Sequence, residues 1–182
     1  MPLLPDVPPL VADDRGNALV SFVRGTEEVL PRDAPLEAAL VAVRRADRVL
    51  MVFDRRRRDW ELPGGCVEEG ESPREAAERE LVEESGQRTD GPLRFIGYAG
   101  FVLAPDRRAE YAALFAGRTT TIRGFRPNDE IAALCWWNLR DALPGRVQPL
   151  DAYLARLAHV TGDRAASANG APAAVRRPGR RP

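Results

Sequence analysis

The sequence predicts one α/β domain in which a β-sheet packs between helices. Short apolar, β-prone segments recur along the chain, and two stretches with helical periodicity interrupt them. Sheets and helices bury their apolar faces against each other, so this alternation favours a layered fold. The chain has 182 residues, 44% of them hydrophobic and 30% charged, which is enough material for one ordinary core.

Composition and alternation indicate six β-prone segments, and two other segments have features of helices. We expect strands at residues 18–23, 38–43, 48–53, 93–101, 110–116 and 131–138. A turn at 44–47 joins the second and third of these. We expect helices at 72–85 and 149–160, so the folded domain is predicted to span residues 15–160.

Both ends of the chain differ from this domain. Residues 1–14 contain four prolines and no clear period, which indicates a flexible arm. Residues 161–182 consist largely of Ala, Gly, Pro and Arg, and cannot bury enough apolar surface to offset the entropy of ordering. We expect a disordered basic tail with solvated arginines.

The net charge of the chain does not indicate a strongly charged partner. The 27 basic and 27 acidic residues cancel, so charge predicts neither a nucleic acid nor a membrane as partner. Every basic residue is an arginine, a bias spread over the whole chain that codon usage in a GC-rich genome explains better than a site.

The sequence favours a soluble, cytoplasmic protein. Its two cysteines, Cys66 and Cys135, imply no disulfide framework. The N-terminus lacks the basic and apolar regions of a signal peptide. No apolar run approaches the roughly 20 residues that span a bilayer.

Residues 60–87 combine a loop with a well-marked helix, and read WELPGGCVEEGESPREAAERELVEESGQ. The Gly-Gly pair at 64–65 allows close approach of the backbone to a ligand. Ser72 is a preferred N-cap, and Glu75 completes a Ser-x-x-Glu capping box. Gly86 is a natural end for the helix.

Three glutamates, Glu80, Glu83 and Glu84, fall within a sector of roughly 100° on this helix. Like charges at these spacings destabilise a helix, and two of them 4 Å apart repel each other by roughly 1 kcal/mol in water and about 4 kcal/mol at an effective dielectric of 20. Mg²⁺ would offset that cost, because it prefers carboxylate oxygens and shares its shell with substrate phosphates. Arg79 precedes Glu83 by four residues and is placed to hold its carboxylate. Taken alone, the three glutamates also fit a solvated acidic face.

The segment resembles the Nudix signature, which is Gly, five residues, Glu, seven residues, then Arg-Glu-apolar-x-Glu-Glu-x-Gly-apolar. Gly65, Glu71 and the run from Arg79 to Gly86 match it in order. The one departure is Gln87, where an apolar residue is usual. Gln87 follows the helix, so we expect it to affect packing more than metal binding. The resemblance implies a Nudix-type α/β/α sandwich with a mixed β-sheet.

The resemblance also implies roles for the matching residues. Glu80, Glu83 and Glu84 would supply metal-binding carboxylates, and the Gly65 carbonyl a further oxygen ligand. The metal would be Mg²⁺, with Mn²⁺ as the alternative. Glu83 would take part in catalysis, and Arg79 would orient a glutamate.

Two further glutamates have expected roles. Nudix enzymes often place a general base or an extra ligand on a distant loop. Glu130, preceded by polar residues and followed by an apolar segment, is the candidate, with an ordinary loop acid as the alternative. Glu71 is expected to hold the loop onto the helix.

Residues ahead of the glycines are candidates for substrate binding. Trp60 could stack on a base or pack beneath the loop. Arg55 and Arg58 bound a run of four arginines that could attract phosphate or form a solvated hairpin edge.

The resemblance implies metal-dependent hydrolysis of a pyrophosphate bond in a nucleoside diphosphate linked to another moiety. Overall similarity favours a nucleoside triphosphate, an oxidised one included, over ADP-ribose or a nucleotide sugar. A non-catalytic nucleotide sensor on a Nudix fold is the competing reading, and the intact carboxylates argue against it. The expected partner is a small nucleotide. No stable nucleic-acid or membrane partner is expected, and a homodimer is allowed.

Overall fold

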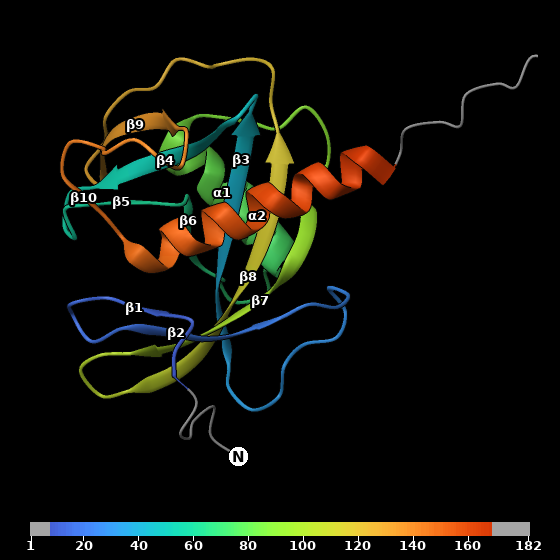
Figure 1. Ribbon diagram of the computed structural model, residues 1–182, viewed down its shortest axis with the longest axis vertical. Helices are drawn as coiled ribbons and strands as arrows, with labels where there is room; N and C mark the ends of the chain where they lie inside the picture. The colour runs from blue at the N-terminus through green and yellow to red at the C-terminus, as the bar shows by residue number, and fades with distance from the viewer. Residues whose placement is uncertain (1–7, 169–182) are drawn as a thin grey trace, which may run out of the picture.

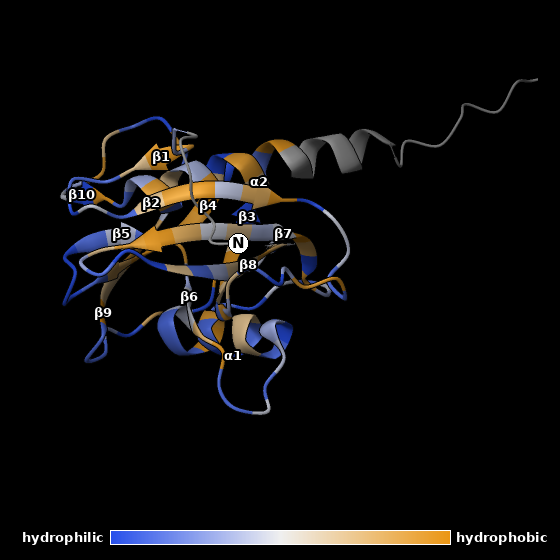
Figure 2. Ribbon diagram, turned by 90° about the horizontal axis from the view of Figure 1, so that it is seen from below, coloured by the Kyte–Doolittle hydropathy of each residue, from blue (hydrophilic) through white to orange (hydrophobic). Residues whose placement is uncertain are grey.

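The computed structural model describes residues 8–168 of the chain, in which one ten-stranded sheet lies between two helices. Figure 2 shows α1 and α2 on opposite sides of apolar strands. The strands and helices, in chain order, are β1 Val11–Ala12, β2 Ala18–Val23, β3 Leu36–Arg45, β4 Arg48–Asp54, β5 Asp59–Glu61, β6 Gly64–Cys66, α1 Pro73–Ser85, β7 Arg94–Leu103, β8 Arg108–Arg118, β9 Ile131–Trp137, β10 Arg146–Val147 and α2 Pro149–Ala168.

The sheet is mixed, as the Nudix resemblance implied. Its order is β1-β2-β7-β8-β3-β4-β5-β10, with β6 paired to β3 and β9 paired to β4. The β3–β8 and β5–β10 pairs are parallel, and the other pairs are antiparallel. α2 crosses β3 and β8 in front, and the β1–β2 hairpin lies at the end of β7 (Figure 1).

The two faces of the sheet each have their own core, because side chains alternate along a strand. On β3, Val41 and Val43 belong to the cluster with α1, whereas Ala42 belongs to the cluster with α2. Leu81 of α1 and Leu154 of α2 anchor the helices, at 3% and 0% exposure. Burying each leucine contributes about 1.5–3 kcal/mol.

The strands β3 and β4 separate soon after their turn, and this separation makes room for the site. They pair only at Arg44 with Val49 and at Arg45 with Arg48. Beyond that point β6 pairs with β3, and β9 pairs with β4. The loop that carries the paired glycines is therefore fixed to the central strand.

Each predicted strand and helix is present, and the boundaries of the domain need correction. β1 lies inside the segment 1–14 expected to be a flexible arm, because Val11 and Ala12 pair with β2. α2 continues to Ala168 and does not end at 160, since alanines in this stretch favour a helix. Residues 169–182, the rest of the expected tail, lie outside the described part of the chain.

Neither helix within residues 8–168 has the length and hydropathy needed to cross a membrane.

Candidate active site

The helix α1 begins and ends as its sequence predicts. The Ser72 side chain accepts a hydrogen bond from the backbone N–H of Glu75, and the Glu75 carboxylate accepts from the backbone N–H of Ser72. Gly86 has φ +68° and caps the C-terminus with a bond to the Val82 carbonyl. These local bonds fix the direction in which the glutamates of α1 project.

The paired glycines bring the backbone against both β3 and α1. A Cβ on Gly64 would lie 2.3 Å from the Ala39 carbonyl oxygen. A Cβ on Gly65 would lie 2.4 Å from Oε1 of Glu80. Only glycine fits at 64, where the clash is with backbone, whereas a side chain at 65 would displace the Glu80 carboxylate from its place beside β6.

The three candidate glutamates of α1 have different environments. Glu84 is 7% exposed, and its Oε2 accepts a 2.9 Å hydrogen bond from the Gly64 N–H. The side chain of Glu80 is 14% exposed and faces Gly65. That of Glu83 is 60% exposed. The three carboxylates thus range from buried Glu84 at Gly64, through Glu80 at Gly65, to solvent-exposed Glu83.

Arg79 joins these carboxylates to the loop before the helix. Its guanidinium donates to Glu71 at 2.9 and 3.0 Å, to Glu80 at 2.7 Å and to Glu83 at 3.2 Å. It also donates to the Cys66 carbonyl at 3.0 Å. Glu71 accepts a further bond from a backbone N–H of the loop, so it holds the loop on the helix as expected.

Burial and mutual repulsion disfavour the ionised forms of Glu80 and Glu84. The pKa of Glu84 is raised to about 8, chiefly by burial and also by the charges of Glu80 and Glu130, while the hydrogen bond from the Gly64 N–H acts in the opposite direction. Burial also raises the pKa of Glu80, against the effect of Arg79. Carboxylates with raised pKa values ionise readily beside a divalent cation, because the cation supplies the missing positive charge.

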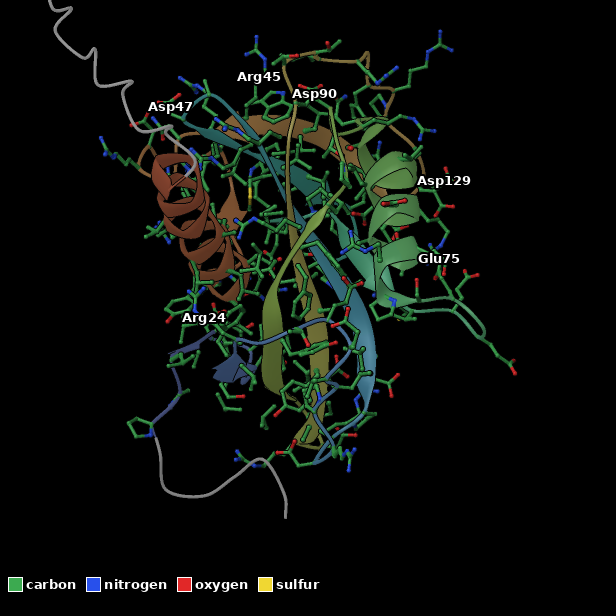
Figure 3. All side chains as sticks on the ribbon, turned by 90° about the vertical axis from the view of Figure 1, so that its right-hand side faces the viewer. Arg24, Arg45, Asp47, Glu75, Asp90 and Asp129 are labelled. Atoms are coloured by element: carbon green, nitrogen blue, oxygen red, sulfur yellow. The ribbon has the colours of Figure 1, made fainter. Side chains whose placement is uncertain are left out.

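Glu130 lies on a loop that several bonds hold against α1. Asn128 donates to the Glu83 carbonyl and accepts from the backbone N–H of Glu130. Arg55 donates to the carbonyl oxygens of Asn128, through its side chain, and of Glu130, through its backbone. Figure 3 shows Asp129, next to Glu130 in the chain, on the same side of the sheet as Glu75 of α1.

The departure from the signature, Gln87, fastens the same loop. Its side chain is fully buried, donates to the Arg123 carbonyl at 2.8 Å and accepts from the Arg123 N–H at 2.9 Å. An apolar residue could not form this pair of bonds. Gln87 therefore acts through packing and loop anchoring, in line with the sequence-based expectation.

A cleft of about 470 Å³ opens beside β6 on the face of the sheet that α2 covers. Its floor comes from β3, β7 and β8, and its walls from the β1–β2 turn, β5 and the start of α2. The lining residues are Arg15, Asn17, Ala38, Leu40, Arg57, Glu61, Leu62, Gly64, Gly65, Cys66, Phe101, Leu103, Ala104, Arg108, Glu110, Ala112, Gln148, Leu150 and Asp151.

The structure separates the three residues proposed for substrate contact from this cleft. Trp60 is 5% exposed, donates to the Pro144 carbonyl and packs against Phe53, so packing is the reading that its position supports. Arg55 braces the Glu130 loop instead of facing the cleft, and Arg58 lies in the exposed β4–β5 turn. A side chain that is already packed or paired is a poor ligand contact.

Sequence reasoning did not single out the charged residues of the cleft, and three of them interact at one end. Arg57 donates to Glu61 at 2.8 Å, and Asp151 accepts from the Leu62 N–H at 3.0 Å. Burial, followed by repulsion from Asp151, raises the pKa of Glu61, and burial raises that of Asp151 as well. Glu61 stands directly before the Leu-Pro-Gly-Gly loop, a signal that was available. The contribution of Asp151 depends on the packing of α2 and has no local signal.

Comparison with known proteins agrees with this geometry. Residues 34–158 match the family profile described as the NUDIX domain. The chain belongs to the Nudix family. Within the described residues, β1, β2 and the end of α2 lie outside the matched Nudix region.

Two curated relatives and one solved structure illustrate the similarity. The 8-oxo-(d)GTP phosphatase of Mycolicibacterium smegmatis is 29% identical over 134 residues, 74% of this chain and 40% of that protein. The CMP-5'-(N-acetyl-N-hydroxy-3-aminopropyl)phosphonate hydrolase of Streptomyces rubellomurinus is 34% identical over 114 residues, 56% of this chain and 55% of that protein. The chain thus spans about half the length of these relatives. The MutT NUDIX hydrolase structure from Burkholderia pseudomallei has a TM-score of 0.58 and 22% identity, covering 68% of this chain and 97% of its own.

Proposed function

We propose that the protein hydrolyses a pyrophosphate bond in a nucleoside diphosphate derivative with the help of a divalent cation. The observation that carries the proposal is that Glu80 and Glu84 of α1 contact the glycine backbone of β6, with Glu83 on the same helix, and that the same glycines line the cleft. A phosphate chain in the cleft would meet these carboxylates at one end.

The donor set fits Mg²⁺, with Mn²⁺ as the alternative. Glu80, Glu83, Glu84 and the Gly65 carbonyl offer only oxygen ligands, which these hard cations prefer. In residues 8–168 no three acidic, His or Cys side chains already converge as a complete ligand set. Mg²⁺ does not require such a cage, because it usually keeps several waters and binds through one or two carboxylates plus substrate phosphates.

When bound, the cation would neutralise phosphate charge and lower the pKa of a coordinated water. Arg79 would hold Glu83 and Glu80 in place through the bonds described above. Glu130 or Glu83 would accept the proton of the attacking water. The water oxygen would bond to one phosphorus, and the bridging P–O bond would break, so that its electron pair leaves on the departing phosphate.

We favour a nucleoside triphosphate as substrate class, an oxidised one included. The relative from M. smegmatis carries the name 8-oxo-(d)GTP phosphatase, which supports this class. The relative from S. rubellomurinus carries the name of a CMP-phosphonate hydrolase, which supports a nucleotide linked to another moiety as the second candidate.

The test is phosphate-product release from a panel of NTPs, oxidised dNTPs, ADP-ribose and nucleotide sugars. Each compound is incubated with the folded protein in Mg²⁺, in Mn²⁺ and in excess EDTA. We expect turnover of one class that requires the cation. Absence of turnover with both metals would refute the proposal and favour the sensor reading, and turnover that persists in EDTA would refute the metal's role.

A further inference from the structure

The residues on the floor of the cleft lie in a row that runs from the glycines of β6 across β3 to β8. Cys66 of β6 pairs with Ala38 of β3, and Ala38 lies beside Ala112 of β8. At about 4.8 Å between strands, β8 lies roughly 10 Å from β6. A sugar and a phosphate fill such a gap between a nucleobase and a pyrophosphate bond.

Small side chains and one aromatic ring give this far end the shape of a slot. Ala38 and Ala112 leave the floor flat, and Phe101 lies directly opposite Glu110 in the β7–β8 register. Glu110 is two residues from Ala112 on β8, so its side chain points to the same face. All four residues line the cleft. A flat, apolar floor beside a ring suits a planar base.

The carboxylate of Glu110 is buried without a full set of donors. The residue is 9% exposed, and within the described chain no donor is aligned for a hydrogen bond with its buried Oε2. Arg108 forms an ion pair with it at 2.9 Å, but the guanidinium side chain is 60% exposed. Burial raises the pKa of Glu110, with a smaller contribution from Glu37. A buried carboxylate in this position gains most from N–H groups that a ligand brings.

We propose that Glu110 is the specificity-determining residue for the base, and that its carboxylate accepts the adjacent N1–H and N2–H groups of guanine once the exposed Arg108 side chain turns away from it. The inference rests on the proposed function, because it assumes that the cleft holds a nucleotide. Guanine offers two neighbouring N–H donors on one edge. Adenine and cytosine offer one donor beside an acceptor nitrogen, which a carboxylate repels. Oxidation at C8 leaves both guanine donors in place.

The experiment measures the affinities of GMP and AMP by titration calorimetry, for the wild-type protein and for Glu110→Gln. The wild type is expected to prefer GMP by roughly 10- to 100-fold, the usual value of one bidentate contact. Glu110→Gln replaces one acceptor by a donor, so the preference should fall to near unity or favour AMP. Glu37→Gln removes a nearby exposed charge outside the cleft, and it should keep the wild-type ratio.

Equal binding of GMP and AMP by the wild type, or an unchanged ratio in Glu110→Gln, would overturn the inference. Glu110→Asp provides a second variant if the glutamine form does not fold. Aspartate keeps the negative charge, but its shorter side chain places the carboxylate farther from the base. This variant should weaken GMP binding more than AMP binding. Guanine preference in binding without turnover of any nucleotide would refute the proposed function and leave this inference standing. Turnover without guanine preference would support the proposed function and refute this inference.

Discussion

The loop-helix unit at residues 63–87 and the cleft beside it are built in different ways. The unit is held by bonds between near neighbours in sequence, such as the Ser72–Glu75 capping box and the Arg79–Glu83 pair. The cleft is assembled from the β1–β2 turn, five strands and the start of α2, most of which lie far apart in the chain. Under the proposed function, the residues for the reaction are therefore specified by the local sequence, whereas substrate selection would depend on tertiary structure.

Replacing Arg79 by Lys should produce the largest effect on activity among the residues around the glutamates. Lysine cannot bind Glu71, Glu80, Glu83 and the Cys66 carbonyl together, because it lacks the planar fork of donors. We expect a loss of about 10- to 100-fold in kcat/KM, the usual cost of losing an orienting partner. Steady-state kinetics at saturating Mg²⁺ measures it. Arg74→Lys, on the same helix but bound to Glu27, is the control, and equal losses in both variants would contradict the specific role of Arg79.

Replacing Asp59 by Asn should destabilise the wall of the cleft. Asp59 is fully buried and accepts hydrogen bonds from Arg15 of the β1–β2 turn and from Arg146 of β10. Because both arginines are partly exposed, we expect a loss of about 2–3 kcal/mol, slightly below that for a fully buried pair. Urea unfolding measures the free energy, with exposed Asp47→Asn as the control. A change no larger than that of the control would show that the turn does not depend on this cluster.

Replacing Gln87 by Leu restores the apolar residue that is usual in the signature and removes the bonds to Arg123. We expect about 1–2 kcal/mol of lost stability and faster hydrogen exchange at the Arg123 amide. Hydrogen exchange followed by NMR checks this. Unchanged protection of that amide would mean that other contacts hold the loop.

A further expected effect, on stability alone, is a pH dependence from Glu61. Its folded-state pKa is raised by burial and by Asp151, from 4.5 to about 8, so the folded protein binds the proton more tightly than the unfolded chain. This contribution to stability is complete below about pH 4.5 and is lost as pH rises toward 8. Glu61→Gln should therefore show a shallower fall of unfolding free energy over this range. An identical slope in the variant would be evidence against the raised pKa.

The difference between the two regions also explains what the sequence could predict. Ser72, Glu75 and Gly86 carry their signals within one helix, and the structure confirms their roles. The short strands β6 and β10 have three and two residues, and their positions are fixed by pairing with β3 and β5, which lie far away in sequence, and not by local propensity. Trp60 illustrates the same limit: its sequence allowed both stacking and packing, and only its 5% exposure favours packing.

The residues of the cleft show most clearly what the sequence alone could not predict. Arg55, Arg57 and Arg58 are neighbours in one arginine run, yet only Arg57 lines the cleft. The turn between β4 and β5 decides which of them points inward, and a run of identical side chains carries no such information. Glu110 is also an ordinary strand residue in the sequence, and its burial beside Phe101 follows from the β7–β8 register.

The roles proposed for the glutamates of α1 are tested most directly by comparing Glu84→Gln with Glu78→Gln. Glu84 is buried against Gly64, whereas Glu78 is exposed on the same helix. The measurement is kcat/KM for the best substrate of the nucleotide panel across a Mg²⁺ titration. We predict a loss of more than about 100-fold in Glu84→Gln, which exceeds the usual effect of residues that merely orient a metal ligand, and no loss in Glu78→Gln. Wild-type turnover by a folded Glu84→Gln protein would contradict the assignment of metal binding and catalysis to this helix.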